Sequence, residues 1–231
     1  MRGVFISGTG TGIGKTFVTR ALAAGLCSKG ERVAALKPVE TGYTDPARSD
    51  AQALAQACAR PELADYAGCF RARLPLSPYA ATLEGEPACP TPALLQRGIE
   101  AAVAPDDVVL VEGAGGLLVP LDARYTTLDL AQTLGLPLLL VAPNRLGVLS
   151  DTLALFDCAE RRGLRVLAVV LVAPAPAAED ASARSNRRIL LDRLPVPVIP
   201  FPHLADDLAL LGEVASTSGL VHLVRSIRAS V

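Results

Sequence analysis

The sequence lacks any marked excess of charge of one sign. Its 231 residues include 22 lysines and arginines against 23 aspartates and glutamates, so the formal net charge is −1. Proteins that bind nucleic acid or anionic membranes through bulk electrostatics carry a basic excess or a basic stripe, and the sequence shows neither. The composition therefore predicts no nucleic-acid partner and no membrane partner.

Cysteine and histidine are also scarce. The five cysteines are odd in number and no two stand in a C-x-x-C spacing, which argues against a disulfide framework or a zinc site. With only two histidines, a metal site would have to use oxygen ligands. There is no apolar signal segment at the start and no uncharged run of the roughly 18 residues that a membrane span needs, so we expect a soluble cytoplasmic protein.

Lysine is the scarcest charged residue. Only Lys15, Lys29 and Lys37 are lysines among the 22 basic residues. An ammonium group is a compact point charge that fits between phosphate oxygens where a planar guanidinium does not. Lys29 stands beside a glycine at an expected helix end and needs no special role. Lys15 and Lys37 are candidate site residues because of the motifs around them.

Short apolar runs alternate with helical stretches along the whole chain. Hydrophobic residues make up 51% of the sequence, enough to bury roughly 70% of the unfolded surface in one core. Apolar runs without polar alternation are typical of strands covered on both faces. We therefore expect one domain over residues 1–231 with a doubly wound α/β fold, its mostly parallel sheet covered by helices on both faces. The expected strands are 3–7, 32–36, 108–111, 137–142, 166–172 and 196–199; the expected helices are 14–29, 49–59, 91–103, 126–134, 148–162, 181–193 and 217–229, with a loop at 173–178.

The first apolar run leads into the glycine-rich segment GTGTGIGKT at residues 8–16, followed by a helical stretch. Strand, glycine loop and helix in this order form a P-loop, in which backbone N–H groups surround phosphate oxygens. Lys15 would reach the β and γ phosphates and the Thr16 hydroxyl would bind Mg²⁺. The loop is one residue longer than the strict pattern. A plain glycine turn would leave the adjacent Lys15 and Thr16 unexplained.

Two further motifs follow expected strands. Lys37 opens the segment KPVETG after the second strand, Asp50 follows a few residues later, and Glu112 ends the strand VVLV before GAGG. Side chains at the carboxyl ends of parallel strands point into the crevice where α/β proteins bind ligands. With Thr16, the carboxylates of Asp50 and Glu112 would give Mg²⁺ three protein oxygens. Each motif alone could be an exposed lysine or a turn-capping carboxylate, but their convergence favours a nucleotide site.

In this order and spacing, GTGTGIGKT, KPVETG with the following Ser-Asp, and VEGAGG resemble the dethiobiotin synthetase family over essentially the whole chain. The resemblance implies an ATP- and Mg²⁺-dependent homodimer that closes 7,8-diaminononanoate with CO₂ into the cyclic urea dethiobiotin. A carbamate would first be phosphorylated to a mixed anhydride, which the second amine attacks with high effective molarity. Charge spreads over phosphoryl oxygens during such a transfer, so cations should dominate the site.

The resemblance also assigns residues. Lys37 and Lys15 would be the catalytic cations, and the carbamate and diamine would be bound by Thr11, Gly12, Lys37 and Thr41. The expected nucleotide contacts are Gly12, Ile13, Gly14, Lys15, Thr16, Phe17, Asp50, Glu112, Gly113, Ala114, Gly115, Pro200, Phe201 and Pro202. After the strand ending at Val172, family members usually place Asn-Asp to read the purine edge, whereas this chain has Val172 and Ala173. Base selection would then rest either on an apolar wall or on main-chain groups at residues 200–202.

Two alternatives use a similar loop. One is a P-loop amidoligase of the cobyrinate or cobyrate type, which commonly carries a fused glutaminase domain for which 231 residues leave no room. The other is a nucleotide-switched positioning ATPase. Those ATPases carry a signature lysine five residues before the P-loop lysine, where this chain has Gly10.

Overall fold

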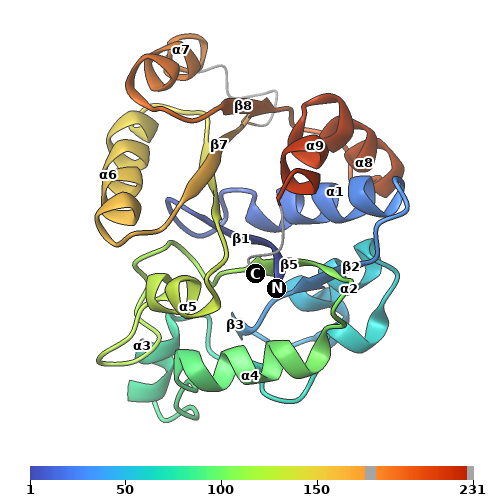
Figure 1. The fold of residues 1–231 in the computed structure, drawn as a ribbon. Helices are drawn as coiled ribbons and strands as arrows, with labels where there is room; N and C mark the ends of the chain where they lie inside the picture. Colours follow the sequence, from blue (N-terminus) through green and yellow to red (C-terminus); the bar gives the residue numbers. More distant parts are fainter. Residues whose placement is uncertain (175–180, 228–231) are drawn as a thin grey trace.

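Six parallel strands form the centre of the molecule (Figure 1). The computed structural model describes residues 1–174 and 181–227. The strand order is β2-β5-β1-β6-β7-β8, and each neighbouring pair is parallel. The strands are β1 (Arg2–Gly8), β2 (Val33–Leu36), β5 (Val108–Glu112), β6 (Leu138–Pro143), β7 (Val166–Val172) and β8 (Val198–Phe201). The doubly wound α/β fold and the predicted parallel sheet are confirmed.

Right-handed crossovers explain how helices cover both faces of this sheet. The chain runs from β1 through α1 toward the β2 edge, whereas the crossovers through α5, α6 and α7 run toward the β8 edge. Because such crossovers are right-handed, the opposite directions put α1 on one face and α5, α6 and α7 on the other. The longer helices are α1 (Lys15–Cys27), α2 (Asp50–Ala57), α4 (Pro92–Ala102), α5 (Thr127–Leu134), α6 (Val148–Arg161) and α7 (Ala183–Arg193).

The direction of winding reverses at β1. Ligands of open α/β sheets bind in the crevice outside the carboxyl ends of the strands at such a reversal. The carboxyl ends of β1, β2 and β5 are at Gly8, Leu36 and Glu112, and the three strands are neighbours. The fold therefore brings the three sequence motifs to one edge of the sheet.

A small second sheet was not predicted. It pairs β3 (Val39–Thr41) in parallel with β4 (Phe70–Ala72), directly after Lys37. The structure also contains the one-turn elements η1 (Pro46–Arg48) and η2 (Pro61–Leu63) and the short helix α3 (Pro78–Leu83). Strands of three residues carry no periodicity in the sequence, so only the pairing itself defines them.

The C-terminal helix predicted over 217–229 is wrong in its bounds. Helix α8 (Leu208–Thr217) begins earlier, where the Asp207 carboxylate accepts the backbone N–H groups of Ala209 and Leu210, and α9 (Leu220–Arg225) follows it. Gly219 separates them with a φ of 87°, a left-handed conformation that favours glycine and ends helices. Residues 228–231, and most of the loop predicted at 173–178, lie outside the described residues.

Helices α1 and α8 approach closely on one face of the sheet, with α9 beside them (Figure 1). A Cβ atom added to Gly25 of α1 would lie 2.9 Å from the backbone oxygen of Gly212 in α8 and 2.7 Å from a methyl group of Val221. Glycine is therefore required by the helix contact. Within the described residues, no helix is both long and apolar enough to cross a membrane.

We predict that Gly25→Ala destabilises the protein. Alanine favours an isolated helix over glycine by about 1 kcal/mol, but the overpacked α1–α8 contact costs about 1–3 kcal/mol. Urea unfolding followed by circular dichroism measures the net change. A gain in stability would show that the two helices separate easily and that the close contact is unimportant.

Candidate active site

The P-loop occupies residues 9–14, between the end of β1 and the start of α1. Gly14 caps α1 with a φ of 97°, and an added Cβ would lie 3.2 Å from a Val172 methyl group. Glycine is therefore needed here for both conformation and space. Lys15 is only 5% exposed, and its Nζ donates to the backbone oxygen of Gly10 at 2.5 Å. The P-loop lysine thus lies along its own loop.

The glycines after Glu112 pack against this loop. A Cβ added to Gly116 would lie 3.1 Å from the backbone oxygen of Gly8 and 3.5 Å from the backbone nitrogen of Gly10. The Leu117 N–H also donates to the Gly8 oxygen. The segment that follows β5 therefore supports the P-loop through direct backbone contact, which explains why it is rich in glycine.

Four predicted site residues meet around the buried Glu112 carboxylate. The Lys37 Nζ donates to Glu112 Oε1 at 2.5 Å and to Asp50 Oδ2 at 2.9 Å. The Thr16 hydroxyl donates to the same Glu112 oxygen at 2.8 Å. Glu112 is completely buried and Lys37 is 5% exposed. Side chains far apart in the sequence thus form one network at the carboxyl edge of the sheet.

The charges in this network shift the pKa values in opposite directions. Burial alone would lower the pKa of Lys37, but the attraction of Glu112 and Asp50 outweighs it and raises that pKa. Burial would raise the pKa of Asp50, but the Lys37 ammonium and its hydrogen bond lower it. Burial, followed by repulsion from Lys37, lowers the pKa of Lys15 to about 8. Lys37 is therefore cationic and Asp50 anionic at neutral pH.

The residues present fit a magnesium ion. Glu112 Oε2 is buried and has no hydrogen-bond partner, so one carboxylate oxygen remains available to a ligand. In the described part of the chain no three acidic, histidine or cysteine side chains gather into a metal cluster. The side chains that could hold an ion here are instead two carboxylates and the Thr16 hydroxyl, all oxygen donors of the kind that Mg²⁺ prefers. So small a set suits a magnesium ion that shares its remaining positions with phosphate and water.

Two cavities open on either side of the P-loop. The Phe17 cavity, of about 460 Å³, is lined by Gly12, Ile13, Gly14, Phe17, Arg20, Pro143, Val172, Ala173, Pro174, His203, Leu204 and Asp206. The Lys37 cavity, of about 380 Å³, is lined by Thr11, Lys37, Val39, Glu40, Thr41, Asp50, Pro75, Leu76, Ser77, Pro78, Ala114, Gly115 and Val119. Thr11 and Gly12 are consecutive but face different cavities, so the loop itself separates them.

Most predicted site residues line these cavities or join the buried network. Pro200, Phe201 and Pro202 line neither cavity. Phe201 is buried and packs edge to face on Phe17, with 5.7 Å between ring centroids. Gly113 also lines neither, because a Cβ there would meet Thr127 and Phe5 in the core.

The sequence analysis missed several residues around these cavities. His203 and Leu204, just beyond the predicted base loop, line the Phe17 cavity, and Arg20 and Asp206 form an ion pair of 2.6 Å at its wall. Near Lys37, Arg71 donates to the backbone oxygens of Lys37, Phe70 and Ala64. The sequence carries no signal for Arg71, since arginine is the ordinary basic residue of this chain.

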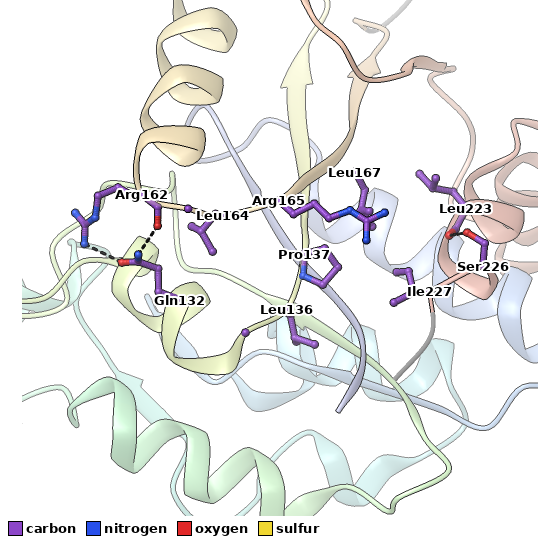
Figure 2. Close-up of a pocket in the computed structure, with 12 residues that line it drawn as sticks. Gln132, Leu136, Pro137, Arg162, Leu164, Arg165, Leu167, Leu223, Ser226 and Ile227 are labelled. Carbon is purple, nitrogen blue, oxygen red and sulfur yellow. Dashed lines mark hydrogen bonds between the residues drawn. The ribbon is translucent and has the colours of Figure 1, made fainter. Parts of the chain in front are cut away.

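A larger cavity, of about 550 Å³, lies at the opposite edge of the sheet (Figure 2). It is bordered by residues that precede β6 and β7, and Figure 2 shows Gln132 paired with Arg162 at one end. None of the predicted site residues lines it. Its position at the amino ends of the strands sets it apart from the usual ligand crevice of α/β proteins.

The glycine loop ending in Lys15 and Thr16, with a strand-end carboxylate beside it, defines a P-loop nucleotide-binding protein. The family model described as "AAA domain" matches residues 2–204. The chain is 38% identical over 221 residues to the ATP-dependent dethiobiotin synthetase BioD of Anaeromyxobacter dehalogenans, covering 93% of this chain and 97% of the relative. The Aquifex aeolicus enzyme of the same name is 35% identical, over 88% and 90%. The chain belongs to the ATP-dependent dethiobiotin synthetase family.

Solved structures share the fold at much lower identity. Cobyrinic acid a,c-diamide synthase from Mycobacterium smegmatis, solved with ADP and magnesium, gives a TM-score of 0.57 at 16% identity, covering 98% of this chain and 96% of that one. The cell division ATPase MinD of Pyrococcus furiosus gives 0.52 at 20% identity, over 94% and 89%. These are the two classes considered as alternatives from the sequence, and the likeness extends to the fold alone.

We predict that Asp50→Asn weakens metal binding far more than it weakens folding, because the Asp50 side chain is 43% exposed in an open crevice. Loss of one charged oxygen ligand should lower Mn²⁺ affinity in the presence of ADP by about 10-fold or more. Electron paramagnetic resonance of free Mn²⁺ measures the affinity, and urea unfolding measures stability. Asp106→Asn, an exposed carboxylate before β5, is the control. Equal metal affinity in wild type and Asp50→Asn would remove Asp50 from the ligand set.

Proposed function

We propose that this chain forms dethiobiotin from 7,8-diaminononanoate, CO₂ and ATP. The observation that carries the proposal is the position of Lys37. Its ammonium group donates to Glu112 in the network beside the P-loop. Lys37 also lines the Lys37 cavity, which the loop separates from the Phe17 cavity. A cation shared by a phosphate site and a second cavity is what a phosphoryl transfer to a second substrate requires.

The reaction follows from the chemistry of a carbamate. One amine of the diamine adds to CO₂ and loses a proton, and the resulting carbamate is a poor electrophile. A carbamate oxygen attacks the γ-phosphorus, ADP leaves, and a carbamic-phosphoric anhydride forms. The second amine then attacks the carbonyl carbon intramolecularly, phosphate leaves, and the five-membered urea ring closes.

The chain's own residues have distinct roles in this scheme. The Phe17 cavity accommodates the base, and the P-loop with Lys15 holds the phosphates. The Lys37 cavity holds the diamine, with the Thr41 hydroxyl and Thr11 near the carbamate, while Gly12, the next residue of the loop, lines the Phe17 cavity. Lys37 balances the charge of carbamate and γ-phosphate together.

Thr16, Asp50 and Glu112 would hold Mg²⁺. When bound, the ion neutralises charge on the β and γ phosphates. Lys37 contacts both carboxylates of this set, so the same two side chains orient the lysine and the nucleotide. Side chains that are held by each other need little reorganisation when substrates arrive.

A homodimer, a location in the cytoplasm and a single domain over residues 1–231 complete the proposal. Leu118 and Leu146 are 52% and 79% exposed, and large exposed apolar side chains suit burial against another subunit. Sedimentation at several protein concentrations tests the dimer.

The activity is tested by combining the chain with ATP, Mg²⁺, bicarbonate and 7,8-diaminononanoate. We expect phosphate release to depend on both the diamine and bicarbonate, with one dethiobiotin formed per phosphate. Phosphate release that is unaffected by the diamine would contradict the proposed function.

We predict that Lys37→Arg is nearly as inactive as Lys37→Ala. The ammonium fits between two carboxylate oxygens at 2.5 and 2.9 Å, and a planar guanidinium cannot replace a point charge there. Both variants should lose about 100-fold or more in kcat, the usual cost of removing one charge-stabilising donor. The measurement is turnover on protein shown to be folded. Near wild-type turnover in the arginine variant would contradict the role of Lys37.

We also predict a relaxed preference for the nucleotide base. The walls of the Phe17 cavity are mostly apolar, with Val172 and Ala173 where the family usually has Asn-Asp. An apolar wall discriminates by only about 1–3 kcal/mol, so CTP and GTP should support turnover within roughly one to two orders of magnitude of ATP. The kcat/KM values of the four nucleotides provide the test. A preference for ATP above about a thousandfold would instead indicate specific polar readout.

A further inference from the structure

Glu40 is a buried carboxylate beside the proposed site that the mechanism does not use. It lies on β3 between Val39 and Thr41 and is 7% exposed. Its Oε1 accepts the backbone N–H of Asp50 at 2.6 Å, and its Oε2 accepts the backbone N–H of Ala51 at 3.1 Å. Both carboxylate oxygens of Glu40 therefore accept hydrogen bonds from the first two residues of helix α2.

These two bonds fix the first turn of a short helix. The initial N–H groups of a helix have no partner within the helix and need outside acceptors. In α2, Glu40 accepts the first two, and the Ser49 hydroxyl accepts the N–H of Gln52 at 3.1 Å. A negative charge at this end also interacts favourably with the helix dipole. The start of α2 is thus held mainly by a side chain from another element.

One of the two N–H groups that Glu40 accepts belongs to Asp50, a predicted metal ligand. Asp50 is the first residue of α2, and residues 44–48 before it are exposed. Ser49 is buried and bonded within this loop, and Glu40 is the contact that reaches the Asp50 backbone N–H from another element. Glu40 links it to β3, which follows directly after Lys37. This link therefore joins the backbone of Asp50 to the segment that carries Lys37, and the two side chains form a 2.9 Å ion pair.

We propose that Glu40 is a positioning residue for the metal-nucleotide site, acting through the backbone of Asp50. The inference rests on the proposed function only in assigning a metal nucleotide to the site. A glutamine at this position keeps one acceptor oxygen but turns an N–H donor toward a backbone N–H. The paired contact therefore requires a carboxylate. An indirect partner of a metal ligand typically changes metal affinity by about 10- to 100-fold.

The first measurement is the affinity for Mn²⁺ in the presence of ADP, without diamine, by electron paramagnetic resonance. We expect Glu40→Gln to weaken it by about 10-fold and Glu40→Ala by at least as much. Asp129→Asn is a matched control, because Asp129 is also a carboxylate that accepts a backbone N–H, that of Thr126, at a helix start. No residue of its helix α5 lines either cavity. The control should lose stability in urea yet keep Mn²⁺ affinity within about twofold of wild type.

The second measurement is a double-mutant cycle with Asp50→Asn. If Glu40 acts through Asp50, then Glu40→Gln in an Asp50→Asn background should weaken Mn²⁺ affinity by less than about twofold further. Additive losses, or an unchanged affinity in both single Glu40 variants, would overturn the proposal. Urea unfolding of both Glu40 variants shows which of them is folded, and the cycle is run with that variant. Because diamine is absent, a chain that binds Mn²⁺ with ADP but makes no dethiobiotin would contradict the proposed function and leave this inference standing.

Discussion

The buried ion pair between Lys37 and Glu112 is the contact on which the geometry of the site depends. Glu112 has no exposed surface, and a charge so buried is stable only when it is paired and hydrogen-bonded. Lys37 and Thr16 provide those partners on one carboxylate oxygen. Since Glu112 ends β5, which pairs with both β1 and β2, the pair ties the ends of three strands together. The hydrogen bonds that stabilise the buried Glu112 carboxylate therefore also bring Lys37 and Thr16 together at the carboxyl edge of the sheet.

The small β3–β4 sheet contacts the backbone of Lys37 and forms part of the wall of the Lys37 cavity. Arg71 on β4 holds the backbone oxygen of Lys37, Glu40 on β3 holds the start of α2, and Thr41 faces the cavity. The contacts of Arg71 and Glu40 each join a backbone group to a side chain on another element. The flexible lysine side chain thus extends from a fixed backbone, which limits the conformational entropy lost when it engages a substrate.

Residues whose role depends on local sequence were predicted, whereas those defined by pairing at a distance were not. The meeting of Lys37, Asp50 and Glu112 could be foreseen, because carboxyl ends of parallel strands share one edge. The contacts of Glu40 and Arg71 could not, because they depend on β3 pairing with β4. Strand β8 ends at the buried Phe201, and His203 and Leu204, beyond the end of the strand, line the Phe17 cavity. The contact of residues 200–202 with the base, which was expected from the resemblance, stays a prediction.

Because Thr11 and Gly12 are adjacent in one loop but line separate cavities, a nucleotide and a diamine bound as proposed would share this segment of the loop as a wall. Any shift of this wall on filling one cavity reshapes the other. Thermodynamic linkage then requires the effect to be reciprocal: whatever factor the nucleotide imposes on diamine affinity, the diamine imposes on nucleotide affinity. A single peptide unit would thus make the two binding equilibria interdependent, without a lid, a hinge or a distant effector site.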